Sequence, residues 1–213
     1  MNHDSIVARE GFPFILPLVI FAISATALGA VWSAIGLSCI AVFVIWFFRN
    51  PDRNTPDIPK MVVSPADGKV IRIEDIERND LIKGRFKKIS IFMNVFNVHV
   101  NRIPYSGKIR AIAYHEGMFF SANLDKASDS NERNSIVIRT DDGRDIMAVQ
   151  IAGLIARRIV CWIKEGMDVR KGERFGLIRF GSRLDVYLPL DSTITVKIGD
   201  RVKAGETPLG GLS

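Results

Sequence analysis

The stretch SIVIRTDDGRDIMAVQI, residues 135–151, decides the fold class of this chain of 213 residues. Two apolar runs rich in β-branched residues, Ser135–Thr140 and Asp145–Ile151, flank the turn signal Asp141-Asp142-Gly143. An Asp-Gly pair between two such runs is typical of a β-hairpin. Short apolar runs and glycine-containing turns recur from Lys60 onward, so the sequence predicts a mainly β domain over residues 60–213.

Two further strands carry specific expectations. Arg183–Leu188 alternates polar and apolar residues, which predicts a half-buried strand. Apolar residues occupy odd positions from Ile89 to Val95 and even positions from Phe96 to Val100. A strand cannot change its buried face without an extra residue, so this switch predicts a bulge or bend around Asn94–Asn97. Bulges often lie beside active sites, and here the bend would aim His99.

An apolar run precedes the β domain: from Gly11 through Phe48 the chain has no Asp, Glu, Lys or Arg. A membrane-spanning helix needs about 20 apolar residues, so this run is too long for one comfortable span and suits two short ones. We expect a transmembrane helical hairpin of Pro13–Gly29 and Val31–Phe48, which makes residues 1–48 a membrane anchor. A single long tilted helix and a helix lying partly in the interface are the alternatives. A cleaved signal peptide fits less well, because its apolar region spans only about 7–15 residues.

Charge and composition favour a position of the β domain at a lipid surface. Arg9 precedes the apolar run and Arg49 and Arg53 follow it, which by the positive-inside rule puts both flanks, and the β domain, on the cytoplasmic side of the inner cell membrane. The chain carries a net charge of +6, and a basic domain is attracted to anionic lipid head groups. No nucleic-acid motif is present, so nucleic acid is not an expected partner. Residues 49–59, with their three prolines, predict an extended linker.

Neither a disulfide nor a metal centre is expected. Cys39 lies in the apolar run and Cys161 in a predicted buried strand, so the two cysteines would not pair. The three histidines, His3, His99 and His115, show no Cys/His spacing of the zinc type.

The segment Phe180-Gly181-Ser182-Arg183 carries the most informative chemistry. Ser182 Oγ can add to the carbonyl of Gly181, because glycine has no side chain to block the approach. An N-to-O acyl shift would give an ester, and β-elimination would leave dehydroalanine, which hydrolyses to a pyruvoyl group. A serine hydroxyl needs a positioned base. His99 titrates in the right range, and Asp67 could fix its tautomer.

The same three residue types would suit a hydrolase, and a Gly-Ser pair by itself is commonest in plain turns. No nucleophile elbow of the Gly-x-Ser-x-Gly kind surrounds Ser182, which argues against the hydrolase. Four motifs stand in order along the chain: SPADGKV at 64–70, FNVHVNR at 96–102, Asn131-Glu132-Arg133 and Gly181-Ser182. With the apolar N-terminus, they resemble the short, membrane-anchored bacterial form of phosphatidylserine decarboxylase proenzymes, from about Phe47 to the C-terminus.

The resemblance implies a lyase that cuts itself between Gly181 and Ser182 into a large chain, 1–181, and a small chain, 182–213. Ser182 becomes the pyruvoyl cofactor, which forms a Schiff base with the substrate amine and accepts the electrons released as CO2 leaves. His99 and Asp67 are implied as processing partners. The implied substrate is phosphatidylserine at the membrane lipid surface, and the product is phosphatidylethanolamine. The two chains of one precursor stay partners, and a homo-oligomer is left open.

This chain departs from the long bacterial form, which usually shows Leu-Gly-Ser-Thr and a second histidine three residues before the triad histidine. Arg183 and Phe96 stand at those positions here, so a role of the second histidine is not transferred. His99 is left as a candidate to protonate the carbanion formed by decarboxylation.

Other functions stay open at this point. Segments at 65–70, 104–109 and 202–210 resemble the β-hairpins of lipoyl- and biotinyl-type barrels, which would also suit a membrane-anchored adaptor without enzymatic activity. Such an adaptor normally carries long helical hairpins, and a carrier domain needs a lysine at its hairpin tip in a recognisable setting; the sequence shows neither. Among enzymes, a decarboxylase of archaetidylserine or of a soluble amino acid is the alternative, and the anchor argues against the soluble substrate.

Overall fold

The structure, a computed structural model, describes residues 5–117, 131–153, 158–179 and 182–213. The chain divides into two compact units, Met1–Asp52 and Arg53–Ser213. The division falls inside the predicted linker, residues 49–59. The residues from Arg53 onward belong to the second unit because the Arg53 side chain is buried there in an ion pair with Asp67.

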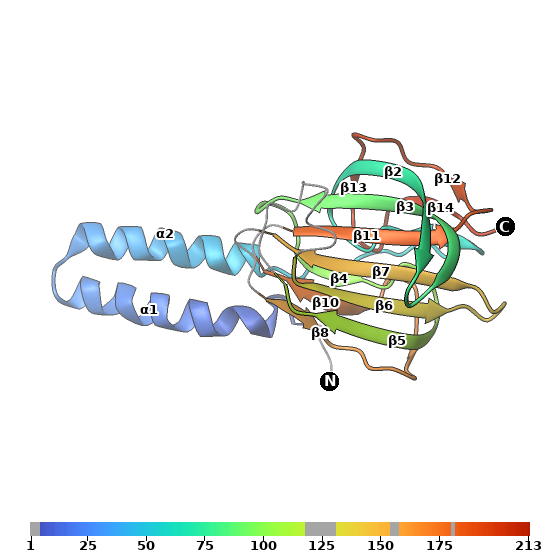
Figure 1. The fold of residues 1–213 in the computed structure, drawn as a ribbon. Coiled ribbons are helices and arrows are strands. Elements are labelled where there is room, and N and C mark those ends of the chain that lie inside the picture. The colour runs from blue at the N-terminus through green and yellow to red at the C-terminus, as the bar shows by residue number, and fades with distance from the viewer. Residues whose placement is uncertain (1–4, 118–130, 154–157, 180–181) are drawn as a thin grey trace. The chain divides into compact units, whose positions relative to one another are not determined.

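The first unit consists of a short 3-10 turn, Arg9–Gly11, and two helices, α1 (Phe12–Ala27) and α2 (Val31–Phe47). The two helices run side by side in opposite directions (Figure 1). Most of their large apolar side chains are exposed, and Trp32 is 87% exposed. Arg9–Ala27 is long and apolar enough to cross a membrane, whereas Val31–Phe47 is shorter. The helix bounds lie within two residues of the predicted ones, and the crossing of a membrane stays a prediction.

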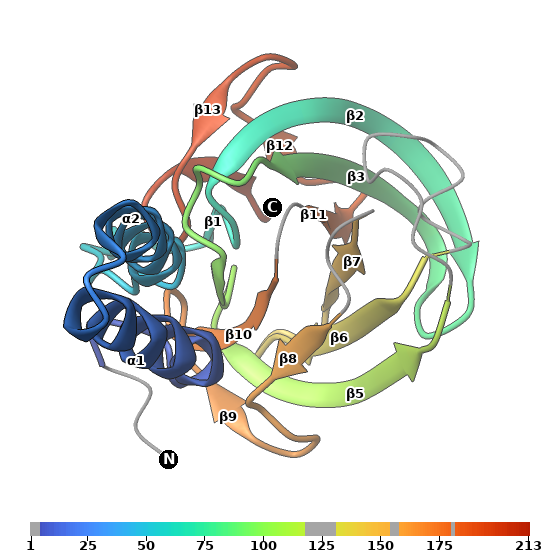
Figure 2. The ribbon, with the colours of Figure 1, turned by 90° about the vertical axis from the view of Figure 1, so that its left-hand side faces the viewer.

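The second unit is mainly β, as predicted. Its strands are β1 (Met61–Val63), β2 (Gly68–Asn79), β3 (Lys83–Met93), β4 (Val100–Arg102), β5 (Gly107–His115), β6 (Arg133–Arg139), β7 (Asp145–Ala152), β8 (Ile159–Cys161), β9 (Asp168–Val169), β10 (Arg174–Ile178), β11 (Ser182–Pro189), β12 (Thr193–Ile194), β13 (Arg201–Val202) and β14 (Pro208–Gly211). The main sheet has eight strands in the order β13-β2-β3-β11-β7-β6-β5-β9, and two three-stranded sheets, β4-β10-β8 and β1-β14-β12, accompany it. Seen end-on, the main sheet is strongly curled (Figure 2).

The hairpin predicted from residues 135–151 is confirmed. β6 and β7 pair antiparallel, with Arg139 opposite Asp145. The turn between them places Gly143 at a φ of 81°, in the left-handed region that glycine enters without steric cost. The inner sides of β6 and β7 contribute Ile136, Ile138 and Ala148 to the main hydrophobic core.

The expectation of a half-buried strand at Arg183–Leu188 is wrong, because β11 is buried on both faces. β11 pairs with β3 on one side and with β7 on the other. Its inner face adds Leu184, Val186 and Leu188 to the core. On the outer face, Arg183 is 2% and Asp185 0% exposed. The polar residues alternate there because Arg183 and Asp185 form a buried ion pair, with Arg183 Nε 2.9 Å from Asp185 Oδ1. They do not contact solvent.

The predicted bend at Asn94–Asn97 is confirmed. β3 ends at Met93, the chain turns over Val95–Asn97, and β4 begins at Val100 in a different sheet. The apolar residues change parity here because the chain leaves the main sheet and enters the β4-β10-β8 sheet. This change of sheet sets the place of His99, which precedes β4.

Candidate active site

Ser182 is the first residue of β11 and lies between two neighbouring strands. It stands opposite Met93 of β3 and Ala152 of β7, and it is fully buried. Among the residues that the structure describes, no group forms a hydrogen bond with its Oγ.

Gly181, the other residue of the predicted cleavage site, lies outside the described residues. β10 ends at Ile178, three residues before Gly181. The Ile178 N–H donates to the carbonyl of His99 at 3.3 Å. His99 therefore lies beside the strand that leads into the predicted cleavage site.

His99 follows a turn that is built by two asparagine side chains. Asn97 Oδ1 accepts a hydrogen bond from the Asn94 N–H at 2.9 Å, and Asn94 Oδ1 accepts one from the Phe96 N–H at 2.9 Å. The buried His99 ring has its Nδ1 3.0 Å from the carbonyl oxygen of Asn97. A carbonyl only accepts, so Nδ1 carries the hydrogen and Nε2 of the neutral ring keeps its lone pair.

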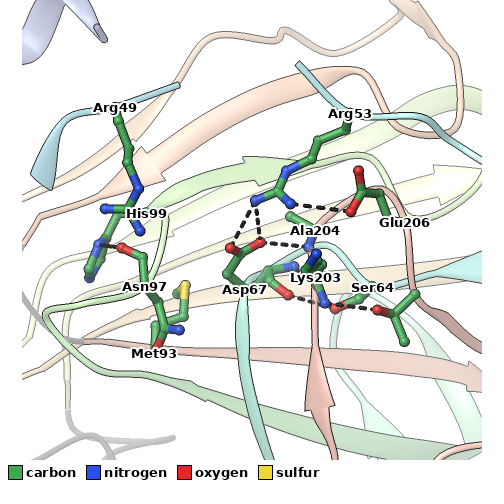
Figure 3. Close-up of polar contacts among 12 residues, drawn as sticks. Arg49, Arg53, Ser64, Asp67, Met93, Asn97, His99, Lys203, Ala204 and Glu206 are labelled. Carbon is green, nitrogen blue, oxygen red and sulfur yellow. Dashed lines mark hydrogen bonds and ion pairs between the residues drawn. The ribbon is translucent and has the colours of Figure 1, made fainter. Parts of the chain in front are cut away.

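Asp67 is buried in the loop before β2, and its carboxylate binds other partners than His99. Arg53 Nη2 donates to Asp67 Oδ1 at 3.0 Å and to Oδ2 at 2.9 Å, and the Ala204 N–H donates to Oδ1 at 2.8 Å. Arg53 also binds Glu206 at 3.3 Å. Figure 3 shows this cluster, and His99 bound to Asn97 as a separate group.

The structure therefore differs from the predicted Asp67–His99 pair. The acceptor that orients His99 Nδ1 is the Asn97 carbonyl, while the Asp67 carboxylate forms an ion pair with Arg53. A guanidinium offers several donors to the two carboxylate oxygens at once, which makes it the stronger partner for a buried aspartate. Arg53 was missed because it lies in the proline-rich segment, and the Asn97 carbonyl because a main-chain acceptor leaves no mark in a sequence.

Two pockets lie elsewhere in the second unit. One of about 370 Å³ is lined by Tyr105 and Lys171 among others, and one of about 240 Å³ by Arg133 and Tyr187 among others. The largest pocket is the usual first candidate for a ligand site, but neither pocket is lined by Ser182 or His99. Ser182 and His99 are both buried.

Comparison with known proteins identifies the family. The family model for phosphatidylserine decarboxylase matches residues 40–210. A phosphatidylserine decarboxylase proenzyme of Syntrophus aciditrophicus is 56% identical over 211 residues, which cover 99% of both chains. Proenzymes of the same name from Desulfotalea psychrophila, at 50% identity over 96% of this chain and 95% of the relative, and from Magnetococcus marinus, at 45% identity over 100% and 98%, are also similar. The chain belongs to the phosphatidylserine decarboxylase family.

Proposed function

We propose that this chain is a phosphatidylserine decarboxylase proenzyme that cuts its own peptide bond between Gly181 and Ser182 and then converts phosphatidylserine to phosphatidylethanolamine and CO2. The full-length similarity to proenzymes of that name supports the reaction. The observation that carries the cleavage site is the buried Ser182 Oγ, which has no hydrogen-bond partner among the described residues. In this proposal the hydroxyl reacts with the neighbouring carbonyl of Gly181.

In the proposed cleavage, the neutral His99 ring acts as the base. Nε2 takes the proton of Ser182 Oγ, which adds to the Gly181 carbonyl carbon. The C–N bond breaks, and the proton passes to the departing amine, which leaves an ester between Gly181 and Ser182. Loss of the Ser182 Cα hydrogen then breaks the Cβ–O bond and releases Gly181 as a carboxylate. The dehydroalanine at position 182 reacts with water and gives a pyruvoyl group and ammonia.

Asn97 and Asp67 support this step in different ways. The Asn97 carbonyl fixes the His99 tautomer and stabilises the ring when it becomes charged. Asp67 holds Arg53 and the Ala204 N–H, and so ties the loop before β2 to the residues before β14. In this arrangement Asp67 acts on processing by fixing its loop, and not by binding the imidazole.

The pyruvoyl group would form at the first residue of β11. A pyruvoyl group at position 182 supplies an electron sink for the pair of electrons released as CO2 leaves. β11 pairs with β3 from Ser182 to Pro189 and with β7 from Ser182 to Tyr187, which supports a small chain, residues 182–213, that stays in the sheet after cleavage. The two chains therefore remain partners, and position 182 remains where Ser182 was.

The helical unit is proposed as the membrane anchor, with the β unit on the cytoplasmic side. The exposed apolar side chains of α1 and α2 support this proposal. A truncated chain that starts at Arg49 should still cleave itself, but its turnover of phosphatidylserine in vesicles should fall far more than its turnover of a dispersed short-chain analogue. Equal losses on the two substrates, or no cleavage, would show that the helices serve the active site itself.

Mass spectrometry of the purified full-length protein tests the proposed function. We expect chains of residues 1–181 and 182–213, the latter blocked by pyruvoyl, together with release of CO2 from phosphatidylserine vesicles. Ser182→Ala should remain one chain and be inactive. Active protein that consists of a single uncut chain would refute the proposal.

A further inference from the structure

The segment Asn131–Asn134, at the start of β6, sends buried hydrogen bonds in two directions. It contains the Asn-Glu-Arg motif, to which the proposed mechanism assigns no role. Asn131, Glu132 and Asn134 are 0%, 5% and 2% exposed. Each uses its polar groups on strands other than β6, so the segment connects parts of the second unit that lie far apart in the sequence.

The first direction leads to the residue opposite Ser182. Asn131 Nδ2 donates to the Ala152 carbonyl at 2.7 Å, and the Ala152 N–H donates to the Glu132 carbonyl at 2.9 Å. Ala152 is the β7 partner of Ser182. The N–H and the C=O of Ala152 are therefore both held by Asn131 and Glu132, from the β6 side of β7, while Ser182 of β11 pairs with Ala152 from the other side.

The Glu132 carboxylate extends this direction to β8. Its Oε1 accepts from the Ile159 N–H at 3.1 Å and from the Tyr114 hydroxyl at 2.6 Å. Burial and then this hydrogen bond to Glu132 raise the pKa of Tyr114 to about 12, so the phenol remains a donor at neutral pH. β5, β6 and β8 are thus joined at one carboxylate.

The second direction leads to the strand that carries His99. Asn134 Nδ2 donates to Gln150 Oε1 at 2.9 Å, and Gln150 Nε2 donates to Asn101 Oδ1 at 2.8 Å. Asn101 lies in β4, two residues after His99, and its Nδ2 contacts Met93 Sδ at 3.7 Å. Gln150 and Asn101 are both fully buried. Three amides in sequence thus join β6, β7 and β4 across the interior.

Because Gly176 has no side chain, the Gln150 amide fits beside it. Gly176 stands opposite Asn101 in the β10–β4 pair. A Cβ on Gly176 would lie 3.2 Å from Gln150 Nε2 and 2.2 Å from the Val160 carbonyl oxygen. The position therefore has room for the Gln150 amide and for the neighbouring strand, but not for a further side chain.

Burial alone does not explain three adjacent amides. Well-packed apolar residues can replace buried polar groups at little cost, whereas a network with one member removed is strongly destabilised. What amides add is direction, since each hydrogen bond fixes a distance and an orientation. The two directions end at Ala152, which is paired with Ser182 of β11, and at Asn101 of β4, two residues after His99.

We propose that Asn131–Asn134 is a positioning element, which sets His99 relative to Ser182 through Gln150 and Asn101 on one side and through Ala152 on the other. Gln150 is the key residue for this connection, because its side chain bonds to Asn134 on one side and to Asn101 of β4 on the other. The proposal rests on the proposed function, since it assigns these residues to the cleavage step. In this proposal each of them acts through the strand that it holds.

The test compares Gln150→Leu with a matched control, Thr140→Val. Thr140 is also buried, at 2% exposure, and its Oγ1 accepts from the Arg144 N–H at 3.0 Å at the opposite end of β6. Gln150→Leu should slow self-cleavage of folded protein about tenfold to a hundredfold, since a misplacement of about 1 Å has an effect of that order. Thr140→Val should cleave at the wild-type rate. Cleavage is followed by the appearance of the 182–213 chain.

A second readout observes His99 directly. In the uncleavable Ser182→Ala protein, the ring signals of the three histidines are resolved by NMR after selective labelling. The His99 signals should shift or broaden when Gln150→Leu is added, and should not change when Thr140→Val is added. Unchanged His99 signals in the Gln150→Leu protein would contradict the proposal.

Gln150→Glu gives a pH signature that a general loss of stability would not. A buried carboxyl has a raised pKa and is neutral at low pH. Neutral, it can again donate to Asn101; charged, it can only accept. The ratio of its cleavage rate to that of the wild type should therefore rise as the pH falls, while the ratio for Gln150→Leu stays flat. If Gln150→Leu fails to fold, the pH dependence of Gln150→Glu tests the positioning role of Gln150 instead.

Two outcomes separate this proposal from the proposed function. Wild-type cleavage by Gln150→Leu and a flat ratio for Gln150→Glu, with His99→Ala inactive in cleavage, would overturn the positioning role alone. Wild-type cleavage by His99→Ala would overturn the mechanism on which the positioning role depends. Equal slowing of cleavage by Gln150→Leu and Thr140→Val would overturn the positioning role as well, because the effect would then be one of general stability.

Discussion

The two ends of the hairpin formed by β6 and β7 handle polar groups in opposite ways. At the turn, Arg139 binds Asp145 at 2.6 Å, with side chains 45% and 19% exposed, six residues apart in the chain. At the other end, Gln150 binds Asn101, 49 residues away, and both are fully buried. An exposed local ion pair contributes little because water competes for both groups, whereas a buried long-range contact has no such competitor.

This contrast separates polar residues that complete a turn from those that fix the site. At the buried end, Ala152 of β7 is paired with Ser182 of β11. Asp67, which is bound by Arg53, directly precedes β2, and the first residues of β2 pair with the end of β3. Substitutions at the buried end should therefore have large effects on cleavage or stability, and equivalent substitutions elsewhere small ones.

The largest effect is expected from His99→Ala. Removal of a general base should slow self-cleavage by about 10²–10⁴-fold. His115→Ala is the matched control, because His115 is an exposed histidine at the end of β5. Quantification of cut and uncut chain over time measures both. A large effect of His115→Ala, or none of His99→Ala, would break the contrast between buried and exposed groups.

The next effect concerns the buried ion pair. Arg53→Gln leaves the Asp67 carboxylate without its guanidinium, although both side chains are about nine-tenths buried, and we expect a loss of about 3 kcal/mol in the free energy of unfolding. Denaturant unfolding of the Ser182→Ala protein, with and without Arg53→Gln, measures it. In a double-mutant cycle, Asp67→Asn should recover part of the loss, and strict additivity would show that the two side chains do not interact.

A smaller effect should appear at alkaline pH. The pKa of Tyr114 is raised from 10.0 to about 12, first by burial and then by the hydrogen bond to Glu132. The folded protein then holds this proton more tightly than the unfolded chain, so the associated stability is complete below about pH 10 and is lost as the pH rises towards 12. The difference in unfolding free energy between wild type and Tyr114→Phe should shrink over that range. A constant difference would show that the hydroxyl does not titrate as stated.

The smallest effect is expected from Arg139→Gln at the turn. Asp145 keeps a second partner, Arg110, at 3.2 Å, and an exposed pair of this kind contributes about 0–1 kcal/mol. The unfolding free energy should change by less than about 1 kcal/mol, with cleavage unchanged. A loss as large as that of Arg53→Gln would remove the distinction between the two ends.

Local pattern was enough to predict several elements. The hairpin of residues 135–151 follows from its turn residues and the bend at Asn94–Asn97 from a change of periodicity. The helix bounds follow, within two residues, from the charge-free run of residues 11–48. The strand at Arg183–Leu188 was also predicted, but its exposure was wrong, because an ion pair between residues 183 and 185 produces the same alternation as a solvated face. The likeness to lipoyl-type hairpins stays a prediction.

The order of residues was enough to predict the β class, the apolar helices and, through its motifs, the family, with Ser182, His99 and Asp67 as candidate site residues. Their partners became known only from the folded chain: Arg53 for Asp67, the Asn97 carbonyl for His99, and Asn101 for Gln150. The physical reason is that periodicity records whether a side chain is buried and on which face. The partner of a buried polar group depends instead on which distant strands the folded sheets bring together, and main-chain acceptors leave no trace in the order of residues.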